Sequence, residues 1–257
     1  MTNEFTGKKV LVAGGTGGIG KAIAEAFLVG GARVFVQGRN LQKLEKLISE
    51  LDVKYKGNIS GTSSNLLIAE DFSKLLDAAN NFLDRIDVLV LAIGSGKFKK
   101  TGLLTQEEWS QVMDQNFYST ALLLNTAAPF LEKGLDSNVV VMGSIAGIER
   151  LNAPVGYTVA KAALHAYVRA MSAELASRKI RVNIIHPGNI YFEGGRWEEI
   201  QDEDPAGTKN YIESVVPQRR FGSPEDVAQA VLALASPKSS FITGASLEVD
   251  GGQSVSF

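Results

Sequence analysis

Tyr157 and Lys161 stand four residues apart in the stretch YTVAK, within an alanine-rich segment that has helical spacing. Residues at positions i and i+4 lie on one face of a helix. A nearby ammonium group favours the phenolate form, so it lowers the pKa of a tyrosine from its usual value of about 10. A tyrosine tuned in this way suits a general acid/base that works near neutral pH. Many helices carry such a pair by chance, so the pair alone does not predict catalysis.

A hydroxyl group stands at the end of an apolar run earlier in the chain. Ser144 follows Gly143 and the run from Asn138 to Met142, which we predict to be a strand. A hydroxyl in that place could hydrogen-bond the oxygen atom of a substrate. Taken alone, this serine also has an ordinary structural explanation, so its meaning depends on what lies beside it.

Five glycines crowd the nine residues VAGGTGGIG, from Val12 to Gly20. The two possible registers are Gly15, Gly17 and Gly20, which spell G-x-G-x-x-G, and Gly14, Gly18 and Gly20, which spell G-x-x-x-G-x-G. A glycine turn between a strand and a helix lets backbone N–H groups approach a pyrophosphate, and the helix N-terminus adds positive potential. We therefore predict a dinucleotide site here. The alternative is a tight turn without a ligand.

The next predicted strand ends in Val36-Gln37-Gly38-Arg39-Asn40. Proteins that bind NAD usually place a carboxylate about 20 residues past the glycines, where it holds the ribose 2′-hydroxyl. No acidic residue lies between Arg33 and Gln42, whereas Arg39 offers a guanidinium that can pair with a 2′-phosphate. This pattern favours NADP(H) over NAD(H). The alternative is that Arg39 is a solvated surface residue.

Short β-rich runs alternate with helical patterns along the chain. The predicted strands are residues 10–13, 34–36, 87–93, 138–142, 180–185 and 246–249. The predicted helices lie around residues 23–27, at 41–51, from the capping box Thr105–Glu108 to about 131, at about 155–177, and after Ser223. This alternation predicts one α/β domain over residues 1–257, with a doubly wound, mostly parallel sheet and helices on both faces. Ligands of such sheets bind at the carboxyl ends of the strands.

The segment from Gly188 to Gln218 fits no clear period and holds Gly194, Gly195 and Trp197. A loop of that length inside a compact domain is usually a lid or a binding loop. We therefore expect a substrate loop at about residues 188–218.

Composition excludes several classes of protein. The 257 residues carry a net charge of −2 and are 45% hydrophobic, which is typical of a globular protein and gives no reason to expect nucleic acid. The absence of cysteine excludes disulfides and thiolate metal sites, and the two histidines are poor evidence for a metal. No apolar run reaches the roughly 18 residues that span a bilayer, and the first residues lack an apolar signal core. We expect a cytoplasmic protein that binds no metal and no membrane.

In combination these motifs resemble one family, the short-chain dehydrogenases/reductases of the one-domain type, over nearly the whole chain. The matching motifs are Gly14-x-x-x-Gly18-x-Gly20, Asn116, Gly143-Ser144, Tyr157-x-x-x-Lys161, Arg181-Val182-Asn183, Pro187-Gly188 and Asp250-Gly251-Gly252. The resemblance implies a Rossmann-type fold and selects the wider glycine register, which leaves Gly15 and Gly17 incidental.

The resemblance also implies a mechanism. The nicotinamide would exchange hydride with a carbonyl or a secondary alcohol, and Tyr157 would exchange the proton with the substrate oxygen, which Ser144 would hold. Lys161 would lower the Tyr157 pKa and bond the nicotinamide ribose, and Asn116 would hold a water that connects Lys161 to solvent. The implied cofactor-binding residues are Gly14, Gly18, Ile19, Gly20, Arg39, Asn65, Gly94, Tyr157, Lys161, Pro187, Gly188 and Ile190, the last through its backbone.

Three positions depart from the family pattern. Leu91-Ala92-Ile93 replaces Asn-Asn-Ala after the central strand, so we expect apolar packing there. Phe192 replaces a threonine, which removes one expected contact to the nicotinamide carboxamide. Asn65 stands where an aspartate usually lies near the adenine, and it can still accept a hydrogen bond.

The substrate and the direction of the reaction stay open, since relatives act on acyl thioesters, sugars, steroids, polyols and small ketones. A 3-oxoacyl thioester is one candidate. Lys97, Lys99 and Lys100 could attract an anionic substrate or form a solvated face, and Phe192, Trp197 and Tyr211 could close an apolar lid or simply pack it.

The family usually forms dimers or tetramers. The alanines Ala162, Ala163, Ala166 and Ala170 would permit close helix packing in a homodimer or homotetramer, although a core-facing stripe explains them equally well. The leading hypothesis is an NADP(H)-dependent carbonyl reductase or alcohol dehydrogenase. The alternatives are a cofactor-binding sensor or structural subunit without turnover, and a lyase or dehalogenase on the same scaffold.

Overall fold

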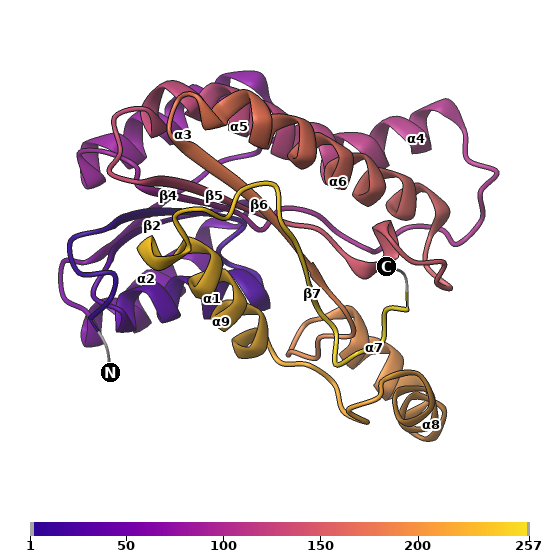
Figure 1. Cartoon of the computed structure of the whole chain (residues 1–257). Helices are drawn as coiled ribbons and strands as arrows, with labels where there is room; N and C mark the ends of the chain where they lie inside the picture. Colours follow the sequence, from indigo (N-terminus) through magenta and orange to yellow (C-terminus); the bar gives the residue numbers. More distant parts are fainter. Residues whose placement is uncertain (1–2, 256–257) are drawn as a thin grey trace.

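Seven parallel strands form one sheet in the order β3-β2-β1-β4-β5-β6-β7 in the computed structural model, which describes residues 3–255 (Figure 1). The strands are β1 (Lys9–Ala13), β2 (Arg33–Gly38), β3 (Ile59–Ser63), β4 (Val88–Leu91), β5 (Ser137–Met142), β6 (Ile180–Pro187) and β7 (Ser246–Val249). The strand order reverses between β1 and β4, so their carboxyl ends open a crevice. The predicted doubly wound sheet is confirmed. Residues 1–2 and 256–257 of the predicted domain lie outside the described residues.

Helices cover both faces of the sheet. They are α1 (Gly18–Val29), α2 (Leu41–Lys54), α3 (Ala69–Leu83), α4 (Gln106–Met113), α5 (Ser119–Leu131), α6 (Val155–Ala176) and α9 (Pro224–Ala235). Figure 1 shows α1, α2 and α9 on one face, and α3, α5 and α6 on the other.

The strands are apolar at successive positions because side chains alternate between two buried faces. Leu11 and Leu89 lie in register on the face that α3, α5 and α6 cover, whereas Val12 and Val90 point to α1 and α9. This two-sided burial explains why the strands were visible as continuous apolar runs in the sequence.

The long helix predicted after Thr105 is interrupted. Its capping box is present, since Thr105 accepts from the Glu108 backbone and Glu108 reaches back to the Thr105 backbone. After α4 the chain forms a π-helical turn, η1 (Asp114–Tyr118), before it continues as α5. Such turns shift the direction of the side chains that follow and often occur at functional sites.

The expectation that residues 188–218 form a loop is wrong. The segment contains α7 (Arg196–Glu203) and α8 (Pro205–Val215), which lie outside the two helical layers (Figure 1). The helical period was missed because these helices bury few side chains: only Thr208 and Ile212 of α8, and none of α7. A usable signal was present, since Asp204 caps α8 through the Gly207 backbone and Pro205 occupies its first turn.

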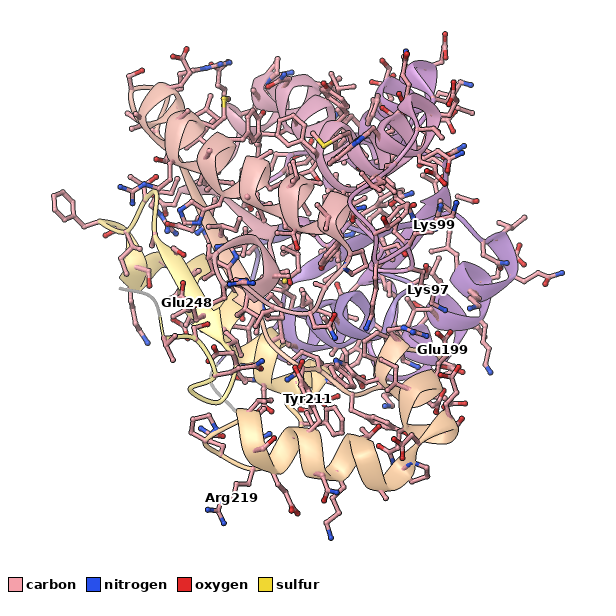
Figure 2. The ribbon with its side chains drawn as sticks, turned by 90° about the vertical axis from the view of Figure 1, so that its right-hand side faces the viewer. Lys97, Lys99, Glu199, Tyr211, Arg219 and Glu248 are labelled. Carbon is pink, nitrogen blue, oxygen red and sulfur yellow. The ribbon has the colours of Figure 1, made fainter. Side chains whose placement is uncertain are left out.

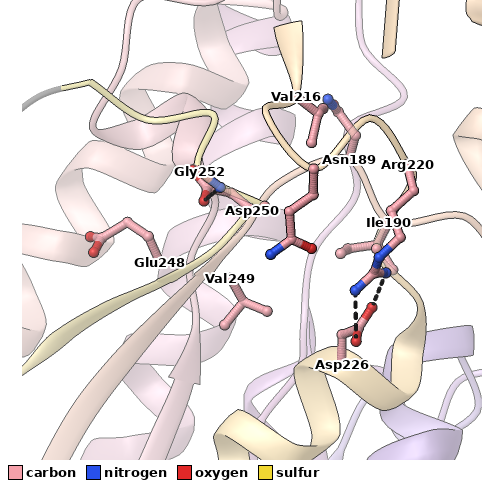
Figure 3. Close-up of a pocket in the computed structure, with 12 residues that line it drawn as sticks. Asn189, Ile190, Val216, Arg220, Asp226, Glu248, Val249, Asp250 and Gly252 are labelled. Atoms are coloured by element: carbon pink, nitrogen blue, oxygen red, sulfur yellow. Dashed lines mark hydrogen bonds and ion pairs between the residues drawn. The ribbon is translucent and has the colours of Figure 1, made fainter. Parts of the chain in front are cut away.

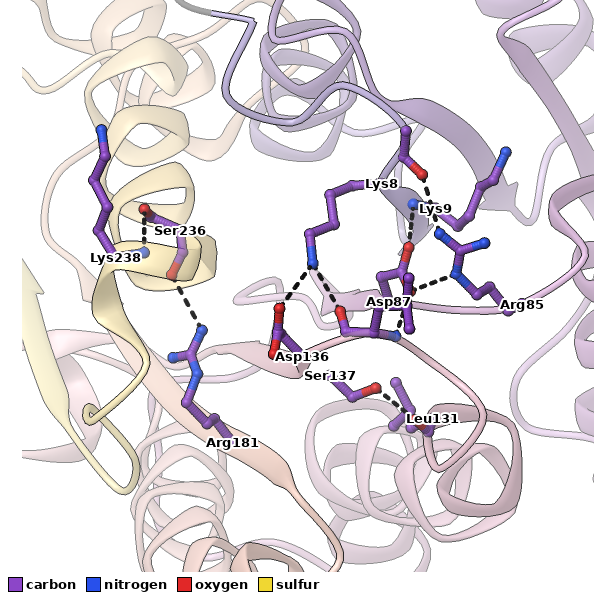
Figure 4. A network of polar contacts seen from close by, with 12 residues as sticks. Lys8, Lys9, Arg85, Asp87, Leu131, Asp136, Ser137, Arg181, Ser236 and Lys238 are labelled. Atoms are coloured by element: carbon purple, nitrogen blue, oxygen red, sulfur yellow. Dashed lines mark hydrogen bonds and ion pairs between the residues drawn. The ribbon is translucent and has the colours of Figure 1, made fainter.

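Polar side chains tie the amino ends of the strands together, far from the crevice (Figure 4). Asp87 is fully buried and accepts hydrogen bonds from the backbones of Lys9 (2.9 Å) and Leu135 (2.7 Å) and from Arg85 Nε (2.9 Å). Arg181 donates to the carbonyls of Leu234 and Ile242, both at 3.0 Å.

Asn183, two residues after Arg181, bonds Ile242 O and Ala245 N, so the Arg-Val-Asn motif holds the connection between α9 and β7. No helix in the described range 3–255 is long and apolar enough to cross a membrane.

Candidate active site

The glycine turn leads from β1 into α1 and touches the end of β4. Gly14 has φ +78°, and a Cβ atom there would lie 2.2 Å from the carbonyl oxygen of Ala92. A Cβ on Gly20 would lie 2.3 Å from Gly14 O. A Cβ on Gly17 would make only an ordinary van der Waals contact, 3.7 Å from Gly14 O. The backbone therefore demands glycine at positions 14 and 20. Position 20 belongs to both registers, so it is the contrast between Gly14 and Gly17 that favours the wider one.

Gly15 and Gly18 face side chains rather than backbone. A Cβ on Gly15 would lie 2.5 Å from Val36 Cγ1. Gly15 was expected to be incidental, but a larger residue there would collide with Val36. A Cβ on Gly18 would lie 2.2 Å from the ring of Phe192. The Phe192 ring thus lies on the first turn of α1 instead of joining an apolar lid.

The departure at residues 91–93 gives the predicted apolar packing. Leu91 is fully buried, and Ala92 and Ile93 pack against the two cores. The close approach of Gly14 to Ala92 O means that this segment forms one wall of the glycine turn.

One end of the crevice is an open cavity of about 300 Å³ beside the glycine turn. Its lining includes Gly14, Gly94, Gln37, Arg39, Asn40, Lys43 and Asn65. Gln37 is buried and joins the turn to the next strand, because its Oε1 accepts from Gly14 N (3.0 Å) and its Nε2 donates to Ser64 O (2.8 Å). Arg39 and Lys43 are exposed.

Sequence reasoning missed Lys43. The lysine lies in the first turn of α2, whose N-cap Asn40 accepts from the Lys43 backbone at 2.9 Å. The available signal was its position four residues after Arg39. The N-cap Asn40 lies between these two cations, and both of them line the same cavity.

The other end of the crevice is a cavity of about 330 Å³ that gathers residues from the ends of β5 and β6, from the turns after β1 and β4, and from α1, α6 and α7. The predicted residues that line it are Gly14, Gly18, Ile19, Gly20, Gly94, Ser144, Tyr157, Lys161, Pro187, Gly188 and Ile190. Gly14 and Gly94 line both cavities, so the two cavities form the ends of one groove.

Lys161 is buried in this cavity, with 2% of its surface exposed. Its Nζ donates to Met142 O at 2.8 Å and to Ile93 O at 3.4 Å, at the ends of β5 and β4. Burial lowers the pKa of Lys161 to about 8.

The Tyr157 pKa moves in the opposite direction from the one expected. Burial raises the pKa of the phenol above its ordinary value, and the hydrogen bond from the Ser144 side chain only partly opposes that effect. Lys161 Nζ lies 5.9 Å from the centre of the Tyr157 ring and bonds the carbonyls of Met142 and Ile93. The expectation of a Tyr157 pKa below its ordinary value is therefore wrong for this structure, because desolvation of the buried phenol dominates the shift.

Asn116 lies behind Lys161, in the π-helical turn η1. Its Oδ1 accepts from Ser95 N (2.9 Å), and its Nδ2 donates to Val112 O (3.1 Å). Gly94 has φ +136°, and a Cβ atom there would lie 2.7 Å from Asn116 Oδ1 and 3.1 Å from Lys161 Nζ. The π turn and the glycine together bring Asn116 next to the lysine.

A larger cavity of about 920 Å³ opens beside Ser144 and Tyr157. Trp197 of α7 and Tyr211 of α8 line it, and their rings stack with centres 5.5 Å apart. Two of the three aromatic residues suggested as a lid therefore form one wall of this cavity.

Two of the three lysines at its mouth are paired with carboxylates. Lys97 bonds Glu199 across the cavity, and Lys99 bonds Glu108 (Figure 2 labels Lys97, Lys99 and Glu199). Lys100 also lines the cavity.

A fourth cavity lies under the turn that follows β6 (Figure 3). Gly188 N donates to Val249 O (3.0 Å), and a Cβ on Gly188 would lie 2.7 Å from Asp250 Cβ. Asp250 in turn accepts from the backbones of Gly252 and Ser254. The terminal Asp-Gly-Gly motif thus supports the turn that carries Ile190.

The two histidines, 21 residues apart in the sequence, meet in the fold, where His165 Nδ1 lies 3.1 Å from His186 Nε2. Within residues 3–255, no three His, Asp or Glu side chains converge as a metal site would require.

The chain is similar to known proteins over nearly its whole length. Residues 13–254 match a family model described as enoyl-(acyl carrier protein) reductase. The chain is 34% identical to mouse dehydrogenase/reductase SDR family member 4, over 97% of this chain and 88% of the relative. It is 31% identical to the 3-oxoacyl-[acyl-carrier-protein] reductase FabG of Aquifex aeolicus (strain VF5), over 98% and 99%.

Two solved structures are also similar. An NADPH-bound short chain oxidoreductase of Pseudomonas aeruginosa PAO1, described as containing an atypical catalytic center, superposes with a TM-score of 0.92 at 28% identity, over 98% of this chain and 99% of that one. A 7α-hydroxysteroid dehydrogenase complexed with NADH and 7-oxo glycochenodeoxycholic acid gives 0.89 at 28%, over 99% and 98%.

Proposed function

The chain belongs to the short-chain dehydrogenase/reductase family, and on that premise we propose that it transfers hydride between NADP(H) and a carbonyl or secondary alcohol, with Tyr157 as general acid/base. The observation that carries the proposal is the shared cavity, where Ser144, Tyr157 and Lys161 face the glycine turn. The residues fit a dinucleotide, because Cβ atoms on Gly14 and Gly20 would collide with backbone where a pyrophosphate must approach closely.

A bound nicotinamide supplies the hydride, and the chain's own residues handle the oxygen and the proton. The Ser144 hydroxyl hydrogen-bonds the substrate oxygen and orients the carbonyl. Tyr157, whose pKa burial raises, stays protonated near neutral pH and donates its proton to that oxygen during reduction. The Lys161 ammonium, held by Met142 O, would offset part of the cost of burying the phenolate that remains, without bringing the Tyr157 pKa below its ordinary value. Asn116 fixes the backbone beside Lys161, and its implied water contact remains a prediction.

The preference for NADP(H) rests on Arg39 and Lys43. Both cations line the open end of the groove, beside the N-terminus of α2, where a 2′-phosphate would lie. Asn65 lines the same cavity and is proposed to face the adenine. One similar structure holds NADPH and another holds NADH, so the proposed preference for NADP(H) rests on Arg39 and Lys43 of this chain.

The substrate cavity favours a carbonyl compound with a sizeable apolar body. Its volume of about 920 Å³ exceeds what a small ketone fills, and Trp197 and Tyr211 offer an aromatic wall. A 3-oxoacyl thioester is one compound of this kind, and the relative from Aquifex aeolicus acts on such a substrate by its name.

A homodimer or homotetramer is proposed on the outer face of α5 and α6. Of the four alanines, Ala162, Ala166 and Ala170 are exposed and Ala163 is half-buried, which supports an outward-facing stripe over a core-facing one. Leu122 of α5 and Val159 of α6 are also 46% and 43% exposed, so the face is apolar enough to bury against a second copy. A cytoplasmic location stays a prediction of the sequence.

The proposal is tested by titrating the purified protein with NADPH and with NADH, followed by cofactor fluorescence. Turnover is then measured on acetoacetyl-coenzyme A, a cyclic diketone, a ketohexose and an oxo-steroid. We expect tighter binding of NADPH and reduction of at least one carbonyl. Tyr157→Phe should lower kcat by about a thousandfold while NADPH still binds. Binding without turnover on any of the four would favour the sensor, and absence of binding would point to Phe192 and to residues 91–93.

A further inference from the structure

His186 is a buried imidazole that the proposed mechanism does not use. It lies near the end of β6, fully excluded from solvent, and its ring faces α6 and the carboxyl end of β5. Burial of a polar ring is unfavourable unless both of its nitrogens find partners, so those partners indicate what the residue does.

Both nitrogens have partners, and one partner is the peptide of Ser144. His186 Nδ1 lies 3.2 Å from Ser144 N and 2.9 Å from Ser144 O. His186 Nε2 lies 3.1 Å from Nδ1 of His165, and the two rings stack with centres 5.2 Å apart. The ring fits only because residue 143 is glycine, since a Cβ on Gly143 would lie 2.5 Å from His186 Nδ1.

The hydrogen-bond network favours one of the two tautomers of His186. Ser144 O already accepts from Gly147 N at 2.9 Å. Within residues 3–255, the Ser144 N–H finds its acceptor in His186 Nδ1. We assign the tautomer in which Nδ1 accepts the Ser144 N–H and Nε2 donates its hydrogen to His165 Nδ1. The contact of 2.9 Å between Nδ1 and Ser144 O would be a hydrogen bond only in the opposite tautomer.

We propose that His186 is a positioning residue for Ser144: it accepts the Ser144 N–H, and His165 fixes the tautomer that makes this possible. The inference rests on the function proposed above. Ser144 is also the N-cap of the short helical turn η2 (Ile145–Gly147), and its Oγ accepts from Ala146 N at 3.2 Å. A shift of the Ser144 peptide therefore moves the hydroxyl that holds the substrate oxygen.

The surroundings keep His186 neutral, as this role requires. Burial lowers the pKa of His186 to about 4, and the charges of His165 and Lys161 on α6 act in the same direction. The Ser144 backbone and Glu248 on β7 raise the pKa, but less than burial lowers it. His165 lies on the same face of α6 as Tyr157 and Lys161, at the next i+4 position. The same helix therefore positions both the proton donor and the residue that fixes the tautomer of His186.

The test compares His186→Leu, which removes the acceptor, with His186→Asn, whose Oδ1 can take the place of Nδ1. The substrate is the panel carbonyl with the highest kcat/KM. We expect Leu to lower kcat by about tenfold to a hundredfold and Asn by less than about threefold, with the NADPH Kd nearly unchanged in both. Val140→Ala, a buried change in β5 that does not touch Ser144, controls for lost stability.

A double-mutant cycle separates positioning from general destabilisation. If His186 acts through Ser144, His186→Leu should cost nothing further in a Ser144→Ala background. An equal loss in both backgrounds, or a wild-type kcat in His186→Leu, would overturn the inference. If the Leu variant does not fold, histidine-selective ¹⁵N NMR of the wild type must still show His186 Nδ1 unprotonated, and the opposite tautomer would refute the assignment. A wild type that reduces no carbonyl would instead count against the proposed function.

Discussion

The two ends of the groove are built in different ways. At the open end, Arg39 and Lys43 project from the surface, where water and salt surround them. At the catalytic end, Lys161 and Asn116 are buried, and each makes two hydrogen bonds to the chain. The open end presents charged groups on long, exposed side chains, whereas hydrogen bonds hold the polar groups of the catalytic end in fixed positions.

This difference predicts which substitutions should have large effects on binding, rate or stability and which should have small ones. Exposed charges interact weakly through water and are screened by salt, so changes at the open end should alter affinity modestly. Buried groups have no water to replace a lost partner, so changes at the catalytic end should alter rates or stability strongly.

The sharpest test of the catalytic end is Lys161→Met. The variant removes the buried ammonium beside Tyr157, and we expect kcat to fall by about a hundredfold to a thousandfold. In the wild type, kcat/KM should decline as the pH rises through about 8, where Lys161 loses its proton, and the variant should lack that decline. Rates measured from pH 6 to pH 10 decide this, and a variant with the wild-type profile would contradict the role of Lys161.

The glycine turn joins the two ends, and Gly14→Ala should break it. A Cβ atom 2.2 Å from Ala92 O, at φ +78°, should cost about 3 kcal/mol of stability or more and abolish tight NADPH binding. Gly17→Ala is the matched control, because its Cβ makes only an ordinary contact of 3.7 Å with Gly14 O and its φ is −81°. Thermal unfolding and cofactor titration should separate the two variants, and equal behaviour would refute the wider register.

The catalytic end should also make stability depend on pH. The pKa of His186 falls from 6.5 in the unfolded chain to about 4 in the fold, so the unfolded state binds more protons between those values. Stability is complete above pH 6.5 and should decline by at most about 3 kcal/mol as the pH falls to 4. Urea unfolding at several pH values measures this, and His186→Asn should flatten the profile. An unchanged slope in the variant would assign the acid sensitivity to other groups.

At the open end, Arg39→Gln and Lys43→Gln should each weaken NADPH binding by about tenfold while NADH binding stays the same. The loss should shrink as salt is added, since both side chains are exposed. Lys56→Gln removes an exposed lysine from the turn between α2 and β3 and serves as the control. Equal losses for NADPH and NADH would remove the basis for NADP(H) preference.

The smallest effect is expected at the mouth of the substrate cavity. Lys97 and Glu199 form an ion pair whose side chains are 55% and 40% exposed, so the pair is worth less than about 1 kcal/mol. Glu199→Gln should change KM by less than about threefold and leave kcat unchanged. A change of tenfold or more would mean that this exposed pair controls access to the cavity.

Much of the molecule was readable because its sequence signals are local. Strands buried on both faces give apolar runs, and the cap residues Thr105 and Ser223 mark the starts of α4 and α9. The glycine spacing and the Tyr157–Lys161 pair report chemistry within one turn of chain, so the sequence by itself determined the fold class and most of the candidate site.

Tertiary structure decided what depends on residues far apart in the chain. It brought His165 next to His186 and placed Lys43 in the same cavity as Arg39. It also buried Tyr157, which raises the pKa that the i,i+4 spacing alone predicted to fall. It also formed α7 and α8, whose sparse apolar residues give no clear period. The physical reason is common to all of these: burial and pairing depend on the other elements that close around a residue, and no local pattern contains them.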